Sequence, residues 1–130
     1  MRVASSRRMT PQELRARFER FADDVIGLCT GTSSDPLRLQ LLLQLQRAAT
    51  SAASNYRAAC RAQSRPAFVA KVSIALEEAD EATGWLQRLS VQRIGERAAI
   101  EQLLREANEL SAILTASRRT AQSTRDPRGG

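Results

Sequence analysis

Apolar residues recur along the first segment of the chain at the spacing of an α-helix. From residue 10 to residue 29 they follow one another in steps of four and three, at Leu14, Phe18, Phe21, Val25 and Leu28. Steps of this size place side chains on one face of a helix and leave polar side chains on the other. The segment is therefore predicted to be an amphipathic helix that packs against other helices.

Three further segments show the same periodicity. A second helix is predicted from about Leu37 to Ala62, and a third from Pro66 to about Leu89. The sequence SVQRIGE, residues 90–96, is predicted to connect the third helix to the fourth. The fourth helix carries a regular apolar stripe consisting of Ile100, Leu103, Leu104, Ala107, Leu110 and Leu114.

The starts of the first three helices are marked by capping residues. Thr10, Asp35 and Ser64 are each followed within two residues by a proline. Their side-chain oxygens can accept bonds from the first free amides of a helix, and proline is well suited to the first helical turn. These signals place the helix starts more firmly than the helix ends.

Composition agrees with an all-α fold, since helix-forming residues dominate and few residues are β-branched or aromatic. Four amphipathic helices with short connections predict an antiparallel, up-down-up-down four-helix bundle. The bundle is expected over residues 10–119. A basic N-terminal tail is expected over residues 1–9 and a disordered C-terminal tail over residues 120–130.

Charge is distributed unevenly along the chain. The formal net charge is +6, and residues 36–76 carry five arginines and Lys71 without any acid. Acids follow at Glu77, Glu78, Asp80 and Glu81. Segregation of this kind makes a polyanion a plausible partner, although a solvated basic surface would give the same pattern.

The second helix is expected to have two distinct faces. Residues from Leu41 to Cys60 at helical spacing form the bundle-facing stripe, and Arg47, Arg57 and Arg61 lie on the opposite side. Leu39 and Leu43 continue that opposite side and should be exposed in a monomer. Exposed leucines beside a polar strip suggest a subunit interface.

Several classes of chemistry are not supported. The chain has no histidine, which excludes Ser-His-Asp catalysis and Glu-x-x-His metal sites. Cys29 and Cys60 have no metal-like spacing and are expected to be free, buried thiols. No cofactor or metal ligand set is predicted. No apolar run is long enough for a membrane span, and no signal peptide is apparent, so a cytoplasmic location is the default expectation.

The second and third segments together resemble a known family. The stretch from Gln44 to Leu89 is similar to the signature of bacterial four helix bundle proteins, also called 23S ribosomal RNA intervening-sequence proteins. The matching positions are Gln44, Leu45, Arg47, Ser51, Asn55, Ser64, Phe68, Lys71, Glu78, Glu81, Trp85 and Leu86.

The resemblance implies a four-helix protomer in a ring-like homopentamer and no enzymatic activity. Distant relatives of the family are accessory proteins of diversity-generating retroelements, which bind a reverse transcriptase and nucleic acid. A reverse transcriptase is therefore a further candidate partner.

The leading hypothesis is a non-catalytic, oligomeric protein that binds RNA or DNA. Arginine and lysine side chains would neutralise phosphates, so binding would be salt-dependent and weakly sequence-selective. The candidate nucleic-acid-binding residues are Arg47, Arg57, Arg61, Arg65, Lys71, Arg118 and Arg119. In the competing interpretation, Arg47 or Arg61 pairs with Glu78 or Glu81 of a neighbouring helix or subunit.

Two other functions remain open at this point. One is a protein-binding adaptor that uses Leu39, Leu43 and Trp85 as contacts for another subunit or a partner. The other is a magnesium-dependent nucleotide pyrophosphohydrolase, in which Glu78-x-x-Glu81 and Glu106-x-x-Glu109 would converge on a cation. Asn55 lies between the two faces of its helix and is expected to bond across to another helix or to contact a ligand.

Overall fold

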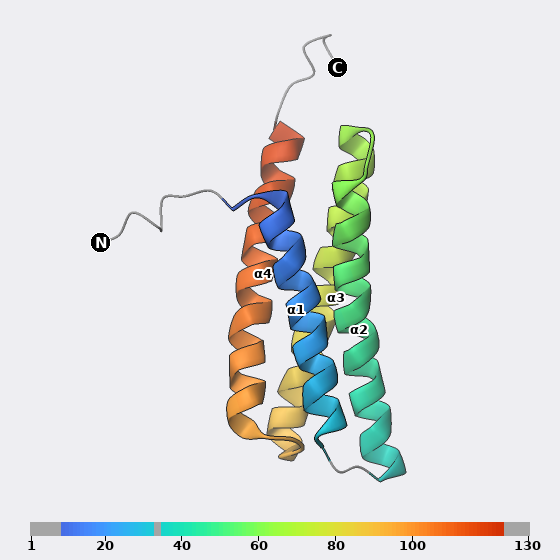
Figure 1. The fold of residues 1–130 in the computed structure, drawn as a ribbon, viewed down its shortest axis with the longest axis vertical. Helices are drawn as coiled ribbons and strands as arrows, with labels where there is room; N and C mark the ends of the chain where they lie inside the picture. Colours follow the sequence, from blue (N-terminus) through green and yellow to red (C-terminus); the bar gives the residue numbers. More distant parts are fainter. Residues whose placement is uncertain (1–8, 33–34, 124–130) are drawn as a thin grey trace, which may run out of the picture.

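The computed structural model describes residues 9–32 and 35–123. In this part of the chain four helices form an antiparallel bundle in which each helix runs opposite to the one before it (Figure 1). The fold class is the one predicted from the sequence. The helices are α1 Pro11–Thr30, α2 Pro36–Cys60, α3 Arg65–Gln92 and α4 Arg97–Ser123.

The helices α1, α2 and α3 begin at the predicted capping residues. The side-chain oxygens of Thr10, Asp35 and Ser64 each accept a hydrogen bond from the amide three residues further on, at 3.1, 2.9 and 3.2 Å. The helix α4 is capped differently, because the Glu96 carboxylate accepts bonds from the amides of Ala98 and Ala99. These bonds satisfy amides that no preceding turn can accept.

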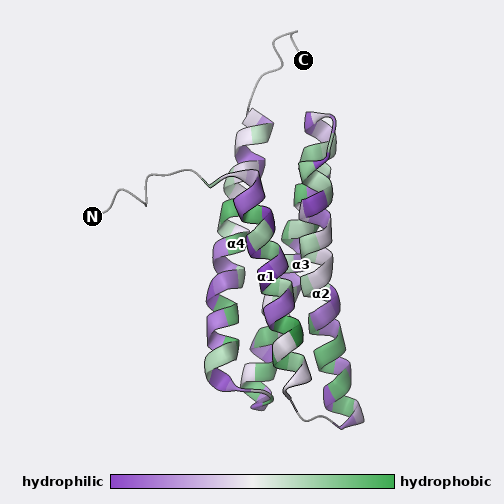
Figure 2. Cartoon of the chain, in the orientation of Figure 1, coloured by the Kyte–Doolittle hydropathy of each residue, from purple (hydrophilic) through white to green (hydrophobic). Residues whose placement is uncertain are grey.

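Packing between neighbouring helices is unequal. The pair α2–α3 makes the most extensive contact and the pair α1–α4 the least, while no Cα atoms of diagonal helices lie within 8 Å of each other in the described part of the chain. Alanines occupy much of the buried surface of α2 and α3, so these two backbones can approach closely. The larger buried side chains, including Phe18 and Phe21, fill the space beside them. Hydrophilic and hydrophobic residues alternate along the helices (Figure 2), and some leucines near the start of α2 are exposed.

The helix α3 continues past its predicted end. It runs to Gln92 and leaves residues 93–96 as the connection, three residues fewer than expected. Arg93 adopts the left-handed conformation (φ 55°), and the amide of Ile94 donates to the Leu89 carbonyl at 2.9 Å. This is a Schellman ending, for which glycine is the usual residue. Since arginine stands there instead, the sequence did not mark the true end.

The outer boundaries of the bundle also differ from the prediction. The helix α4 extends to Ser123, so residues 120–123 belong to the bundle and not to a disordered tail. Met9 packs against the core at the other end of the described chain. Residues 1–8 and 124–130, where the two tails were predicted, lie outside the described residues.

The two cysteines have different environments, and the prediction was wrong for one of them. Cys29 is buried, and its thiol lies 3.7 Å from the Leu42 carbonyl. Cys60 is exposed although Ala53, two helical turns earlier on the same face, is buried. Cys60 is the last residue of α2, where the chain turns away and nothing covers that flank.

Gly95 is expected to be required by its backbone conformation. Its φ is +90°, and an added Cβ would lie 3.4 Å from Ile100 Cδ1 and from Thr32 Oγ1. Gly95→Ala should therefore lower the free energy of unfolding by about 1–2 kcal/mol in urea denaturation. Gly84→Ala is the control, because Gly84 lies within α3 and a Cβ there meets no atom within 4 Å. It should raise stability by about 0.5–1 kcal/mol. Equal effects of both substitutions would contradict the role assigned to Gly95.

Stability should fall at alkaline pH because of the buried Cys29. Burial raises the pKa of this thiol from 9.0 to about 11. Between these values the unfolded chain loses the thiol proton and the folded chain keeps it, so the free energy of unfolding falls as pH rises. We expect a loss of about 1–2 kcal/mol between pH 9 and pH 11.

Cys29→Ala should remove part of this loss in urea denaturation measured across the same range. Burial also raises the pKa of Tyr56, so Tyr56→Phe should remove a further part at the alkaline end. An unchanged pH profile in the double variant would show that neither group is responsible.

Candidate nucleic-acid interface

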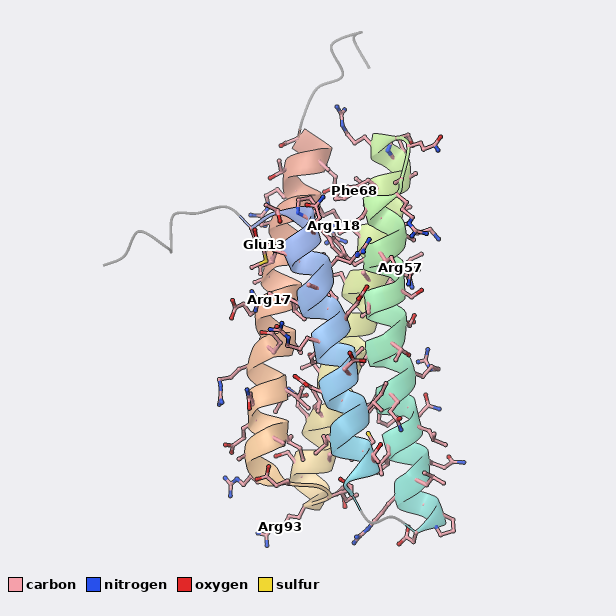
Figure 3. All side chains as sticks on the ribbon, in the orientation of Figure 1. Glu13, Arg17, Arg57, Phe68, Arg93 and Arg118 are labelled. Atoms are coloured by element: carbon pink, nitrogen blue, oxygen red, sulfur yellow. The ribbon has the colours of Figure 1, made fainter. Side chains whose placement is uncertain are left out.

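Six of the seven predicted nucleic-acid-binding residues lie at one end of the bundle, which we call the basic end. They come from the last turns of α2, the first turns of α3 and the last turns of α4, which the antiparallel topology brings together. Figure 3 shows Arg57 and Arg118 in this half of the molecule and Arg93 at the opposite end. The six residues are Arg57, Arg61, Arg65, Lys71, Arg118 and Arg119.

Acids are scarce at the basic end. Neither residues 36–76 nor residues 110–123 contain any aspartate or glutamate. The nearby acids are Glu13 and Glu19 on α1, and Arg15 lies 3.7 Å from Glu19. The basic end therefore has an excess of positive charge contributed by three different helices.

Most of these cationic side chains are free to meet a ligand. All except Arg118 are exposed, and the exposed ones make no ion pair with any described residue. Arg118 is half-buried, and its Nη1 donates to Ser73 Oγ of α3 at 3.3 Å. Arg118 thus fixes the end of α4 to α3, which sequence periodicity did not reveal.

Arg47, the seventh predicted residue, is engaged elsewhere. Its guanidinium lies 3.5 Å from the Glu78 carboxylate and also pairs closely with Glu81, both on α3. Ser51 Oγ donates to the same Glu78 carboxylate at 2.8 Å. Of the two interpretations of Arg47, pairing with a neighbouring helix is the one the geometry supports.

Asn55 belongs to the same group of residues but does not bond across to another helix as predicted. Its Nδ2 donates to the Ser51 carbonyl at 2.9 Å and to Ser51 Oγ at 3.2 Å, one turn earlier on α2. A short amide side chain within a helix can reach the preceding turn, which accounts for the difference. Asn55 thereby orients the hydroxyl that binds Glu78. We call Arg47, Ser51, Asn55, Glu78 and Glu81 the α2–α3 polar network.

The predicted interface residues lie next to this network. Leu39 and Leu43 are exposed, at 45% and 53%, as the helical pattern predicted. Because Arg47 pairs with Glu81 on an antiparallel helix, Leu43 lies level with Trp85, one turn further in each direction. Trp85 is half-buried, and its Nε1 donates to Glu81 at 3.3 Å.

The paired glutamates that suggested a magnesium site do not converge. Glu78 and Glu81 face Arg47, whereas Glu106 and Glu109 of α4 face Arg17 of α1. Among residues 9–32 and 35–123 no group of three or more acids, cysteines or histidines could hold a metal ion. Each of these carboxylates forms an ion pair with an arginine instead.

Arg17 is a structural residue that sequence reasoning missed. Its Nε and Nη2 donate to the two carboxylate oxygens of Glu106 at 3.0 and 2.6 Å, and its Nη1 lies 3.1 Å from Glu109. Hydrogen bonding to Glu106 raises the pKa of Arg17 despite partial burial. Glu106 and Glu109, one turn apart on α4, are visible in the sequence as a pair of acids. Arg17 lies 89 residues before Glu106, so nothing local in the sequence indicates that they pair.

No helix in the described part of the chain has the length and apolar content needed to cross a membrane.

No curated protein matches the sequence. A crystal structure of a protein with unknown function from the S23 ribosomal protein family of Bacteroides thetaiotaomicron is similar in fold, with a TM-score of 0.72 and 28% sequence identity. The similarity covers 85% of this chain and 99% of that one.

The sequence also matches a family model. The model is described as 23S rRNA-intervening sequence protein and matches residues 13–116, from the first turn of α1 into the last turns of α4. The matched region contains both the α2–α3 polar network and most of the basic end. This chain belongs to the 23S rRNA-intervening sequence protein family.

Proposed function

We propose that this protein is a non-catalytic, oligomeric accessory protein that binds nucleic acid through its basic end in the cytoplasm. The observation that carries the proposal is the gathering of cationic side chains from three helices where the adjoining segments lack acids. Charges arranged in this way match a phosphate backbone, because each contact releases condensed counterions. The family description favours RNA as the polymer, and ribosomal RNA or a reverse-transcriptase complex would be a fitting target.

Recognition at this surface is proposed to be led by the phosphate backbone. All five aromatic side chains of the protein lie within the described residues, and none of them is exposed. Base stacking on an aromatic platform therefore has no support at the basic end. Guanidinium contacts to phosphates position a polymer without reading its sequence.

Arg47 is assigned a smaller part in nucleic-acid binding than the basic end. Its guanidinium would have to leave two glutamates before it could contact a phosphate. The five exposed and unpaired cations have no such competitor. The α2–α3 polar network is accordingly proposed to orient α2 against α3.

Replacing Arg57 and Arg61 together with alanine should weaken RNA binding and reduce its salt dependence. Each lost phosphate contact lowers the slope of log Kobs against log [salt] by about 0.7–0.9. Fluorescence anisotropy with a labelled RNA, repeated over a range of salt concentrations, measures both quantities.

The charge-matched control is Arg88→Ala combined with Arg97→Ala, which removes two arginines near the opposite end of the bundle. This control and Arg47→Ala should change the slope much less. A slope that is unchanged in the Arg57/Arg61 variant, or reduced equally in the control, would overturn the placement of the site.

Self-association is proposed to use the apolar strip of Leu39, Leu43 and Trp85, with a pentamer as the expected assembly from the family resemblance. Leu39 and Leu43 are exposed one turn apart on α2, and the half-buried Trp85 of α3 lies level with Leu43. Such a surface gains stability when another subunit covers it. The same strip could instead hold a different protein, which is the adaptor alternative.

Leu43→Asp should reduce the assembly to smaller species, as measured by sedimentation velocity. Leu37→Asp is a demanding control, because Leu37 is 82% exposed on the same helix but about 120° away from Leu43 around the helix axis. The control should leave the assembly intact. A wild-type protein that is monomeric at micromolar concentration would favour the adaptor alternative over self-association.

A further inference from the structure

A groove runs along the bundle between α1 and α4, where contact between neighbouring helices is least extensive. Its volume is about 1200 Å³, and its lining extends from Arg17 of α1 to Gly31 just after that helix, and from Glu96 just before α4 to Glu109 within it. Fourteen residues of helix correspond to a length of about 20 Å. This volume exceeds the roughly 300–1,000 Å³ of ordinary small-molecule sites.

The large apolar side chains that line the groove are already covered by the core. Phe21, Leu28 and Leu103 line its floor but are only 1%, 9% and 5% exposed, since the core already covers them. The accessible lining also includes arginine side chains and the open space beside Gly27.

Three of the four acids that line the groove have hydrogen-bonding or ion-pair partners within the protein. Glu106 and Glu109 share the guanidinium of Arg17, which also lines the groove. The Glu96 carboxylate accepts bonds from two amides at the start of α4. Asp24 is the remaining lining acid, and it makes no ion pair with a described residue.

Four of the five arginines that line the groove have either no ion-pair partner among the described residues or only a distant one. Arg20 of α1, Arg105 of α4 and Arg93 of the α3–α4 connection line it without an ion pair to any described residue. Arg38 at the start of α2 has only a distant contact with Asp35, at 3.9 Å. The lining thus carries five guanidiniums and four carboxylates, and the four guanidiniums other than that of Arg17 have no close carboxylate partner among the described residues.

We propose that the α1–α4 groove binds a ligand bearing several phosphate groups, held by Arg20, Arg38, Arg93 and Arg105. Guanidinium groups match phosphate oxygens with paired, charge-assisted hydrogen bonds, and several arginines around one opening fit several phosphates. The phosphates belong either to a small polyphosphate or to a nucleic-acid strand. The groove lies away from the basic end, so this proposal does not depend on the function proposed above.

Gly27 provides a way to close the groove without disturbing the fold. It lines the groove, and a Cβ built on it meets no atom within 4 Å. A larger side chain at this position would extend into the open space. Gly84 of α3 has the same open surroundings but lies outside the groove, so it provides a matched control. Glutamine is a better helix former than glycine, so both substitutions should preserve or raise stability.

The test measures binding of inorganic tripolyphosphate by isothermal titration calorimetry. Wild type and Gly84→Gln should bind it equally, whereas Gly27→Gln should bind at least about tenfold more weakly, because the added side chain would occupy space that the ligand needs. Arg20→Gln combined with Arg105→Gln should weaken binding further. Arg88→Gln combined with Arg97→Gln, which removes the same charge from outside the groove, should not.

A short RNA oligonucleotide in the same titrations identifies the source of the phosphates. Loss of tripolyphosphate binding in Gly27→Gln without loss of RNA binding would assign the groove to a small ligand. Weaker binding of RNA by Gly27→Gln, with no binding of tripolyphosphate by wild type, would indicate that the groove binds a nucleic-acid strand. If Gly27→Gln and Gly84→Gln bind both probes as wild type does, the proposal is wrong, whatever the basic-end variants show.

Discussion

Close packing of α2 on α3 is the constraint on which the rest of the structure depends. Alanines on both helices let the two backbones approach, and the α2–α3 polar network fixes their register through Arg47, Ser51 and Glu78. That register sets Trp85 level with Leu43 and brings the arginines beyond Tyr56 next to the start of α3. The pair α1–α4 has no comparable row of small residues. It is joined through the ion pairs of Arg17, and the space beside them stays open as the groove.

The residues that resemble the family signature now have a physical explanation. Several of them, including Asn55 and Glu81, belong to one set of contacts between two helices, so a family can preserve this pattern in order to preserve a register. Of the six residues of the basic end only Lys71 is among the matching positions, and none of the six takes part in these contacts. Family membership therefore accounts for the shape of this protein more directly than for its ligand.

Sequence reasoning succeeded where local chemistry determines structure. Capping residues followed by proline located three helix starts, and helical periodicity separated the buried Leu45 from the exposed Leu43. It failed where the outcome depends on distant contacts or on an uncommon residue. The end of α3 has Arg93 in a conformation usually taken by glycine, and Arg17 has partners on the last helix. The α1–α4 groove depends on the separation of two helices, which the spacing of apolar residues along either one does not determine.

The positions of the start of α1 and the end of α4 have a practical consequence. The helix α4 finishes level with the α2–α3 turn, and α1 begins lower down in the same half of the molecule (Figure 1). Any affinity tag, fluorophore or fusion partner joined next to either helix would therefore lie against the surface proposed to bind nucleic acid, and a charged tag would change its potential. Labels are better attached to the exposed opposite end, for example through a cysteine at Val91 in a chain whose Cys60 has been replaced.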